Sequence, residues 1–251
     1  MTPTGPDFDP NEAIQSQLPA VSLLSKLDDA GAKFHYLTQA EALALRGGKA
    51  SQVLLTDILQ AQLSRINTIQ FKGGEHKFSA ANIKRGIAAL EDVPLVEGLM
   101  RANELTYDLL RLGKSFDQTI DGNAKSFTLR YVDWDNPANN VFHVTTEYDL
   151  VRAASDKHCY LDLVLFVNGI PFVNIECKAP GIGLEHAISD VLAYQGQSYV
   201  PEFYKYIQLV LAVNKNEAKY ATVGTEAKFW AVWKSREDID AILQSLISES
   251  L

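Results

Sequence analysis

The sequence has few of the features that mark secreted or membrane proteins. It contains two cysteines among 251 residues, Cys159 and Cys177, too few for a disulfide framework, and such usage favours a reducing cytoplasm. No apolar run approaches the roughly 20 residues of a membrane-spanning helix. The first residues also lack the basic and then apolar pattern of a secretory signal. We therefore expect a cytoplasmic protein that does not contact a membrane.

A surplus of basic residues is also missing. The chain has 23 Lys and Arg against 31 Asp and Glu, a formal net charge of −8 and a pI near 5.1. Proteins that hold nucleic acid without help usually carry a basic footprint. The composition therefore argues against tight autonomous DNA binding. It does not exclude a nuclease, because a metal site needs carboxylates and a partner can hold the DNA.

Hydrophobic residues make up 47% of the chain, enough for a substantial core. Their spacing predicts that the first part is mainly helical, and that a mixture of strands and helices follows. The expected helices cover about 12–29 with an interruption at Pro19, 38–67 with a break at Gly47-Gly48, 79–90, 96–112, 184–199 and 236–248. The expected strands cover 127–132, 141–146, 161–167, 170–178, 206–213 and 229–233. We predict an α/β protein with a mixed central sheet flanked by helices, divided into a helical region 1–115 and a core 116–251.

One predicted hairpin contains the strongest candidates for chemistry. Asn168-Gly169 separates two apolar runs, which is the strongest short-range sign of a β-hairpin. Odd-numbered positions from Leu161 to Cys177 are apolar and are expected to form one buried face, because side chains alternate along a strand. The polar residues Asp162, Asn174, Glu176 and Lys178 occupy even-numbered positions near the open end of the hairpin.

The turn decides whether the two carboxylates meet. A two-residue turn would pair Val167 with Ile170 and leave Asp162 and Glu176 on opposite faces. A three-residue turn with Gly169 as a bulge would pair Phe166 with Ile170. Asp162 would then lie opposite Asn174 and diagonal to Glu176, with backbones roughly 7 Å apart. We predict the three-residue, bulged turn.

Converging carboxylates repel each other unless a cation neutralises them, and oxygen ligands favour Mg²⁺. A lysine beside such a pair can stabilise charge that develops on a phosphate. Any one of Asp162, Glu176 or Lys178 alone is more simply explained as a solvated surface group. Three polar residues at alternate positions of an otherwise apolar strand favour a site for phosphodiester hydrolysis.

The pattern of Asp162, thirteen intervening residues, and Glu176-Cys177-Lys178 resembles the signature of the PD-(D/E)xK nuclease superfamily. The segment 131–140 and the hairpin 162–178 resemble the R subunit of type I restriction enzymes. The residues from Gln195 to Tyr199 resemble the QxxxY motif of one branch, and 223–234 resembles the segment beyond it. The resemblance implies a restriction-endonuclease-like fold and a Mg²⁺-dependent endonuclease, with Mn²⁺ as a possible substitute.

The same resemblance implies roles for individual residues. Asp162, Glu176 and Lys178 would be the catalytic residues, and Asp162, Glu176 and the backbone carbonyl of Cys177 would bind the metal. Gln195 and Tyr199 would position the site and the DNA, although a bond from Gln195 to nearby backbone is an equally good interpretation of its position. The branch also uses an acidic residue on an early helix. Glu12 is best placed for this, ahead of Gln17, but it is equally well explained as an ordinary first-turn glutamate that favours the helix dipole.

The resemblance implies partners as well. R subunits act on double-stranded DNA together with methyltransferase and specificity subunits, and they use ATP in motor domains. This chain contains no Walker A loop, so we expect it to be the nuclease region of a longer subunit, with ATP needed only by the missing motor. Two alternatives remain open: a catalytically silent docking module with a nuclease-like fold, and a stand-alone DNA nuclease of the same fold.

Overall fold

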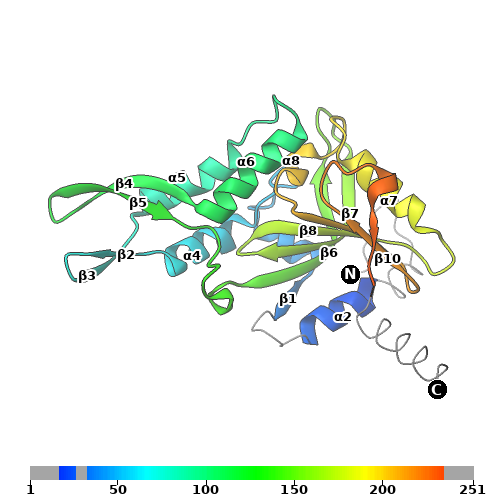
Figure 1. The fold of residues 1–251 in the computed structure, drawn as a ribbon, viewed down its shortest axis with the longest axis horizontal. Helices are drawn as coiled ribbons and strands as arrows, with labels where there is room; N and C mark the ends of the chain where they lie inside the picture. Colours follow the sequence, from blue (N-terminus) through cyan, green and yellow to red (C-terminus); the bar gives the residue numbers. More distant parts are fainter. Residues whose placement is uncertain (1–16, 27–32, 235–251) are drawn as a thin grey trace, which may run out of the picture.

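The computed structural model describes residues 17–26 and 33–234 (Figure 1). Its helices are α2 (Leu18–Lys26), α3 (Gln39–Ala44), α4 (Thr56–Ile66), α5 (Ala80–Glu91), α6 (Leu99–Leu112), α7 (Leu184–Tyr194) and α8 (Pro201–Tyr204). Its strands are β1 (Phe34–Leu37), β2 (Thr68–Phe71), β3 (Gly74–Lys77), β4 (Lys114–Ile120), β5 (Asn123–Leu129), β6 (Phe142–Val151), β7 (His158–Val167), β8 (Ile170–Cys177), β9 (Leu209–Val213), β10 (Ala218–Ala221) and β11 (Ala231–Val232).

A seven-stranded sheet forms the centre of the described structure, in the order β1-β6-β7-β8-β9-β10-β11. The pairs β1–β6 and β8–β9 are parallel and the others are antiparallel. Residues of α7 and α8 pack on one side in a large apolar cluster, and Val21 of α2 packs in a separate cluster with Leu163, Ile175 and Cys177. The expected α/β fold, with a mixed central sheet and flanking helices as in restriction endonucleases, is confirmed.

Most of the expected elements are present, with different ends. Helices at 79–90 and 96–112 are confirmed as α5 and α6, and the 38–67 segment forms two helices, α3 and α4, separated by a break that includes Gly47-Gly48, as predicted. The N-terminal part also supplies strands: β1 joins the central sheet, and β2 and β3 form a hairpin. The expected helix 236–248 and both ends of the expected helix 12–29 lie outside the described residues; the middle of 12–29 forms α2, with Pro19 in its first turn. The division at residue 115 remains a prediction. No helix among the described residues is long and apolar enough to cross a membrane.

The turn between β7 and β8 differs from the prediction. Val167 pairs with Ile170, so the turn has two residues, Asn168 and Gly169, both with positive φ (+54° and +84°). The predicted three-residue turn is therefore wrong. The extra residue lies further along β8, because Phe166 pairs with Pro171 but Leu165 pairs with Val173. A bulge in the strand thus makes the register shift that we had assigned to the turn.

The two-residue turn is held on two sides by other parts of the chain. A Cβ atom on Gly169 would lie 2.6 Å from the carbonyl oxygen of Leu55, and the Leu55 N–H donates to the Gly169 carbonyl at 2.9 Å. The Asn168 side chain is fully buried and donates to the Tyr131 carbonyl and to Asn140 Oδ1 at 2.9 and 2.8 Å. The hairpin is therefore anchored at its turn.

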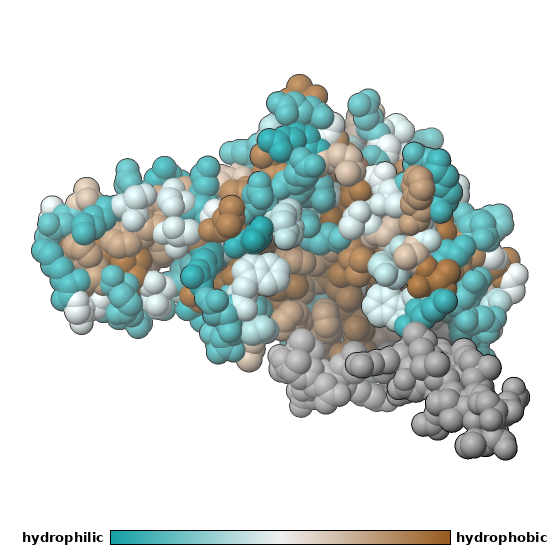
Figure 2. Space-filling model, viewed as in Figure 1, coloured by the Kyte–Doolittle hydropathy of each residue, from teal (hydrophilic) through white to brown (hydrophobic). Residues whose placement is uncertain are grey.

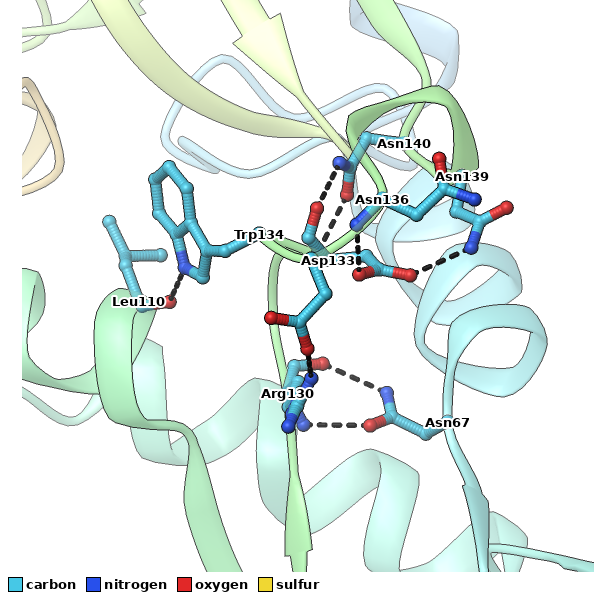
Figure 3. A network of polar contacts seen from close by, with 9 residues as sticks. Asn67, Leu110, Arg130, Asp133, Trp134, Asn136, Asn139 and Asn140 are labelled. Atoms are coloured by element: carbon cyan, nitrogen blue, oxygen red, sulfur yellow. Dashed lines mark hydrogen bonds and ion pairs between the residues drawn. The ribbon is translucent and has the colours of Figure 1, made fainter.

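The loop that receives Asn168 is itself held by side chains (Figure 3). Asn140 accepts a hydrogen bond from the Asp133 N–H at 2.9 Å and donates to the Asp133 carbonyl. The Asp133 carboxylate accepts from the Asn136 N–H and from the Asn139 side chain, and these bonds lower the pKa of Asp133. Segment 131–140 therefore fixes the hairpin that carries the candidate site. The segment resembles one in the R subunits, and these contacts give it a structural role.

Candidate active site

The ladders on both sides of β7 are interrupted at Asp162. Between β6 and β7, Thr146 pairs with Leu163 and Tyr148 with Leu161, while Glu147, which would face Asp162, has a φ of +51°. Between β7 and β8 the pairing ends at Leu163 and Ile175. Backbone groups released from the ladder at this point need other partners, so side chains of the site can replace them.

The interruption also corrects the predicted faces of the hairpin. Leu161 belongs to the apolar cluster under α7 together with Val164 and Phe166, whereas Leu163 belongs to the cluster that includes Val21. The simple odd–even alternation therefore fails at Asp162. Continuing the β7–β8 register by one residue places Asp162 opposite Glu176 and not, as predicted, opposite Asn174, which pairs with Val164.

Asp162 is brought directly against the segment that carries the other two candidates. Its carboxylate Oδ2 accepts a hydrogen bond from the N–H of Cys177 at 2.7 Å, and the residue is only 9% exposed. The Cys177 side chain is buried in the cluster with Val21, so it keeps the apolar character expected at this position. Asp162 thus lies beside the strand end that holds Glu176 and Lys178.

Glu176 and Lys178 form an ion pair at the end of β8. Lys178 Nζ lies 3.0 Å from Glu176 Oε1 and 3.1 Å from Asp190 Oδ2 of α7. The Glu176 side chain is 3% exposed and that of Lys178 is 16% exposed. The Lys178 N–H donates to the Val213 carbonyl of β9 at 2.9 Å. The sheet and α7 together fix this lysine beside a nearly buried carboxylate.

Two tyrosines, the half-buried Tyr194 and the buried Tyr204, are affected by the charges of both carboxylates. Burial raises the pKa of Tyr194 and of Tyr204, and in each case the negative charge of Glu176 is the next contribution. The charge of Asp162 also acts on both phenols. The Tyr204 hydroxyl donates to Asn174 Oδ1 at 2.7 Å. Both carboxylates thus act on the same two phenols, and Tyr204 is joined to β8 through Asn174.

Several residues near the site were not found from the sequence. Glu147 is 4% exposed, and its Oε1 accepts a hydrogen bond from Gln17 Nε2 at 3.0 Å. The predicted strand 141–146 ended one residue before Glu147. Strand β6 continues to Val151, and an extension of the predicted strand to that residue would have placed a glutamate inside it. Asp190 was missed because it does not follow the apolar stripe of α7. The predicted metal ligand Glu12 lies outside the described residues.

The QxxxY residues lie beyond the helix that was expected to carry them. Helix α7 ends at Tyr194, so the predicted continuation to residue 199 is wrong. Gln195 Oε1 accepts from the Gly224 N–H at 2.8 Å, and its Nε2 donates to the Val191 carbonyl at 3.2 Å. These are the nearby-backbone bonds of the alternative interpretation.

Tyr199, the other QxxxY residue, is half-buried between two side chains. Its ring lies 4.1 Å from the Arg152 guanidinium carbon and 5.8 Å from the Tyr194 ring. Neither QxxxY residue has a hydrogen bond to Asp162 or Glu176 among the described contacts. Their roles at the site and toward DNA remain predictions.

The donor set suits a hard cation that keeps part of its hydration. Within the described ranges, no group of three His, Cys, Asp or Glu residues is placed to hold a metal ion by itself. Mg²⁺ does not need such a cage, because it commonly binds through one or two carboxylates, with water and substrate phosphate as the other ligands. Asp162 and Glu176 fit this mode, and the backbone of Cys177 lies between them.

Comparison with known proteins gives a consistent result. The family described as "Type I restriction enzyme R protein N terminus" matches residues 10–229, which is most of the chain. Among curated proteins, the chain is 26% identical over 161 residues to the type I restriction enzyme HindI endonuclease subunit of Haemophilus influenzae. It is 24% identical over 164 residues to the EcoprrI endonuclease subunit of Escherichia coli.

These matches cover only part of each relative. The HindI match covers 60% of this chain and 15% of the relative, and the EcoprrI match covers 64% and 47%. A putative type I restriction enzyme endonuclease subunit, MjaIXP of Methanocaldococcus jannaschii, is 24% identical over 142 residues, which is 55% of this chain and 13% of the relative. The chain thus spans less than half the length of these relatives.

Proposed function

Because this chain belongs to the family of type I restriction enzyme R protein N termini, we propose that it is a Mg²⁺-dependent endonuclease domain that hydrolyses phosphodiester bonds of double-stranded DNA. One observation carries the proposal: Asp162 bonds to the backbone of Cys177, between Glu176 and the lysine that Glu176 pairs with. Acidic and basic groups thus meet at one strand end, where a scissile phosphate needs both metal ligands and a cation.

The acidic groups of the site would bind the metal ion, and the basic group would act on the water and the phosphate. Asp162 and Glu176 would hold Mg²⁺, with the Cys177 carbonyl as a further ligand. The bound ion would polarise the phosphate and lower the pKa of a water molecule. Lys178 would orient the attacking water and stabilise the negative charge that develops on the phosphate. Asp190 would hold the Lys178 ammonium in place through the 3.1 Å ion pair.

We further propose that the domain works within a longer subunit. The relatives are named as endonuclease subunits, and those named HindI and MjaIXP are much longer than this chain. ATP would then serve motor domains outside this chain, while methyltransferase and specificity subunits would provide modification and site recognition. The net negative charge of the chain fits this proposal, because partners would deliver the DNA. A cytoplasmic location remains a prediction.

A cleavage assay tests the proposed activity. Supercoiled plasmid is incubated with the chain and Mg²⁺ or Mn²⁺, comparing the wild type with Asp162→Asn and with Asp92→Asn, an exposed aspartate at the end of α5. We expect metal-dependent nicking or linearisation by the wild type and the control, and none by Asp162→Asn. Cleavage that survives the Asp162 change would contradict the proposal. If the wild type is inactive without its motor, the same variants are compared within the complete R subunit, where equal activity of all three would favour a silent docking module.

A further inference from the structure

Residues 65–89 and 114–130 form a projection that we call the basic arm. It contains the hairpins β2–β3 and β4–β5 and most of α5, and both hairpins extend away from the central sheet (Figure 1). The arm carries eight Lys and Arg and three Asp and Glu, a formal charge of +5. The rest of the chain then carries −13, because the whole chain has −8. Positive charge is therefore concentrated on an otherwise acidic protein.

These cations are available to a ligand. All eight are exposed, including Lys72, Lys77 and Lys125 on the hairpins and Lys84 on α5. Among the described residues, Arg130 alone of the eight forms an ion pair, with Asp135. In Figure 2 hydrophilic residues follow the outline of the arm, and hydrophobic residues lie between its two hairpins. Charges that are not neutralised by neighbours attract a polyanion more strongly.

The arm is also braced, which holds its lysines in a fixed arrangement. The rings of Phe71 and Phe127 meet edge to face at 6.1 Å and join the two hairpins. Lys72 Nζ and Lys125 Nζ lie 5.5 and 5.1 Å from the centre of the Phe71 ring. The Gln118 side chain accepts from the Ser79 N–H and donates to the Lys77 carbonyl, which ties β4 to the end of β3. Preorganised cations lose less entropy on binding than free side chains.

We propose that the basic arm binds the sugar-phosphate backbone of duplex DNA. Phe71 and Phe127 are half-buried against each other, so the arm offers no open aromatic platform on which single-stranded bases could stack. Exposed lysines without such a platform suit phosphate contacts, which are independent of sequence. The acidic remainder of the chain repels DNA, so the arm is where a duplex can approach.

The arm would contact DNA away from the cutting site. Ile170, at the start of β8, packs in the same apolar cluster as arm residues such as Ile69 and Phe116. Glu176 lies six residues further along the strand, about 20 Å away at the usual rise per residue. A duplex that is held by the arm and runs along β8 would therefore reach the proposed catalytic carboxylates. This inference rests on the proposed function, because it assumes that DNA is the substrate.

Binding without catalysis tests the inference separately from the proposed function. Fluorescence anisotropy of a labelled duplex of about 30 base pairs is measured in EDTA at several salt concentrations, starting at about 50 mM. The arm variant is Lys72→Gln/Lys77→Gln/Lys125→Gln. The matched control is Lys49→Gln/Lys157→Gln/Lys228→Gln, which removes the same charge from exposed positions outside the arm. Melting temperatures establish that both variants remain folded.

We expect the arm variant to bind at least about tenfold more weakly than wild type, and its salt slope to fall by about 2 to 3, since each lost phosphate contact removes about 0.9. The control should stay within about twofold of wild type. The inference would be overturned if both variants weakened DNA binding equally, if the arm variant bound DNA like the wild type, or if the wild type did not bind DNA. Wild-type affinity of the arm variant would favour an acidic protein surface as the partner of the arm. Cleavage that survives the Asp162→Asn change would count against the proposed function and would leave the DNA-binding inference standing.

Discussion

Lys178 is the residue whose chemistry the contacts define most sharply. It lies between the carboxylates of Glu176 and Asp190 at 3.0 and 3.1 Å. An ammonium group cannot bind a metal cation, so its role must be to neutralise and to stabilise charge. This distinguishes it from Asp162 and Glu176, which can do both things that a metal site requires: bind the ion and balance its charge.

We predict that Lys178→Ala separates metal binding from cleavage. Mg²⁺ or Mn²⁺ affinity should stay within about threefold of wild type, because removal of a nearby positive charge does not weaken a cation site. Cleavage should fall by about 100-fold or more, the usual cost of losing a group that stabilises transition-state charge. Calorimetry and the plasmid assay measure the two effects.

Lys219→Ala is the matched control for this prediction, because Lys219 also pairs with a carboxylate, Glu185 at 3.4 Å, but on the surface. It should leave both properties near wild type. Loss of metal affinity in Lys178→Ala would mean that the lysine supports the ligands structurally and that its assigned catalytic role is wrong.

At the scale of elements, the β7–β8 hairpin depends on its turn. Gly169 has a φ of +84° and touches the Leu55 carbonyl, so a methyl group there is strained and also meets backbone. Gly48 has a similar φ of +74° but nothing within 4 Å of a Cβ. The two glycines therefore have the same left-handed backbone conformation, but only Gly169 has neighbouring atoms that a methyl group would meet.

We predict that Gly169→Ala lowers the free energy of unfolding by more than about 2 kcal/mol, because strain and a backbone clash add. Gly48→Ala should cost about 1 kcal/mol, from its conformation alone. Urea denaturation measures both. Similar values for the two variants would show that the turn is not held as tightly as the contacts with Leu55 indicate.

A histidine on β6, His143, makes the stability of the folded protein depend on pH. Burial, followed by the positive charge of His35 on the neighbouring strand, lowers the pKa of His143 to about 4. The folded protein therefore favours the neutral ring. Its contribution to stability is complete above the unfolded pKa of about 6.5 and is lost as the pH falls from there toward 4.

We predict that His143→Gln reduces the loss of unfolding free energy between pH 7 and pH 4.5 by about 1 kcal/mol relative to wild type, after allowance for the partly exposed ring. His186→Gln, at an exposed position on α7, is the control and should leave this pH dependence unchanged. Urea titrations at both pH values give the comparison. An identical pH dependence in wild type and His143→Gln would contradict the assigned cause.

The sequence predicted the main elements because most of them follow local periodicity or turn chemistry. Ser79 caps α5 and Gly113 ends α6, as expected from their residue types. The hairpin was found from Asn168-Gly169, but its register was predicted incorrectly. That register depends on contacts of the turn with Leu55 and Asn140, which are distant in sequence.

The candidate site shows the same limit. Asp162, Glu176 and Lys178 could be chosen from their spacing, whereas Glu147 and Asp190 come from other elements, and only the folded structure shows that they lie near the site. The stripe through Gln195 failed because α7 ends one residue earlier, and local spacing cannot show where a helix stops against the Gly224 segment.

For the whole molecule, an acidic body and a basic arm have a functional consequence. The body contains the carboxylates that would bind the metal, and the arm would compensate for the repulsion between this body and DNA. Such a division predicts weak and strongly salt-dependent DNA binding by the chain alone. Tight binding would then require the other subunits that we propose for the assembly.

The proposed nuclease centre requires that Asp162 and Glu176 bind one divalent cation. Isothermal titration calorimetry with Mn²⁺ is performed on the wild type, Asp162→Asn, Glu176→Gln and, as a control near the site, Asp190→Asn. We predict that the Asp162 and Glu176 changes each weaken binding at least about tenfold, while the Asp190 change leaves the affinity within about threefold. If all four proteins bind Mn²⁺ with the same affinity, Asp162 and Glu176 do not share a cation and the proposed nuclease centre is wrong.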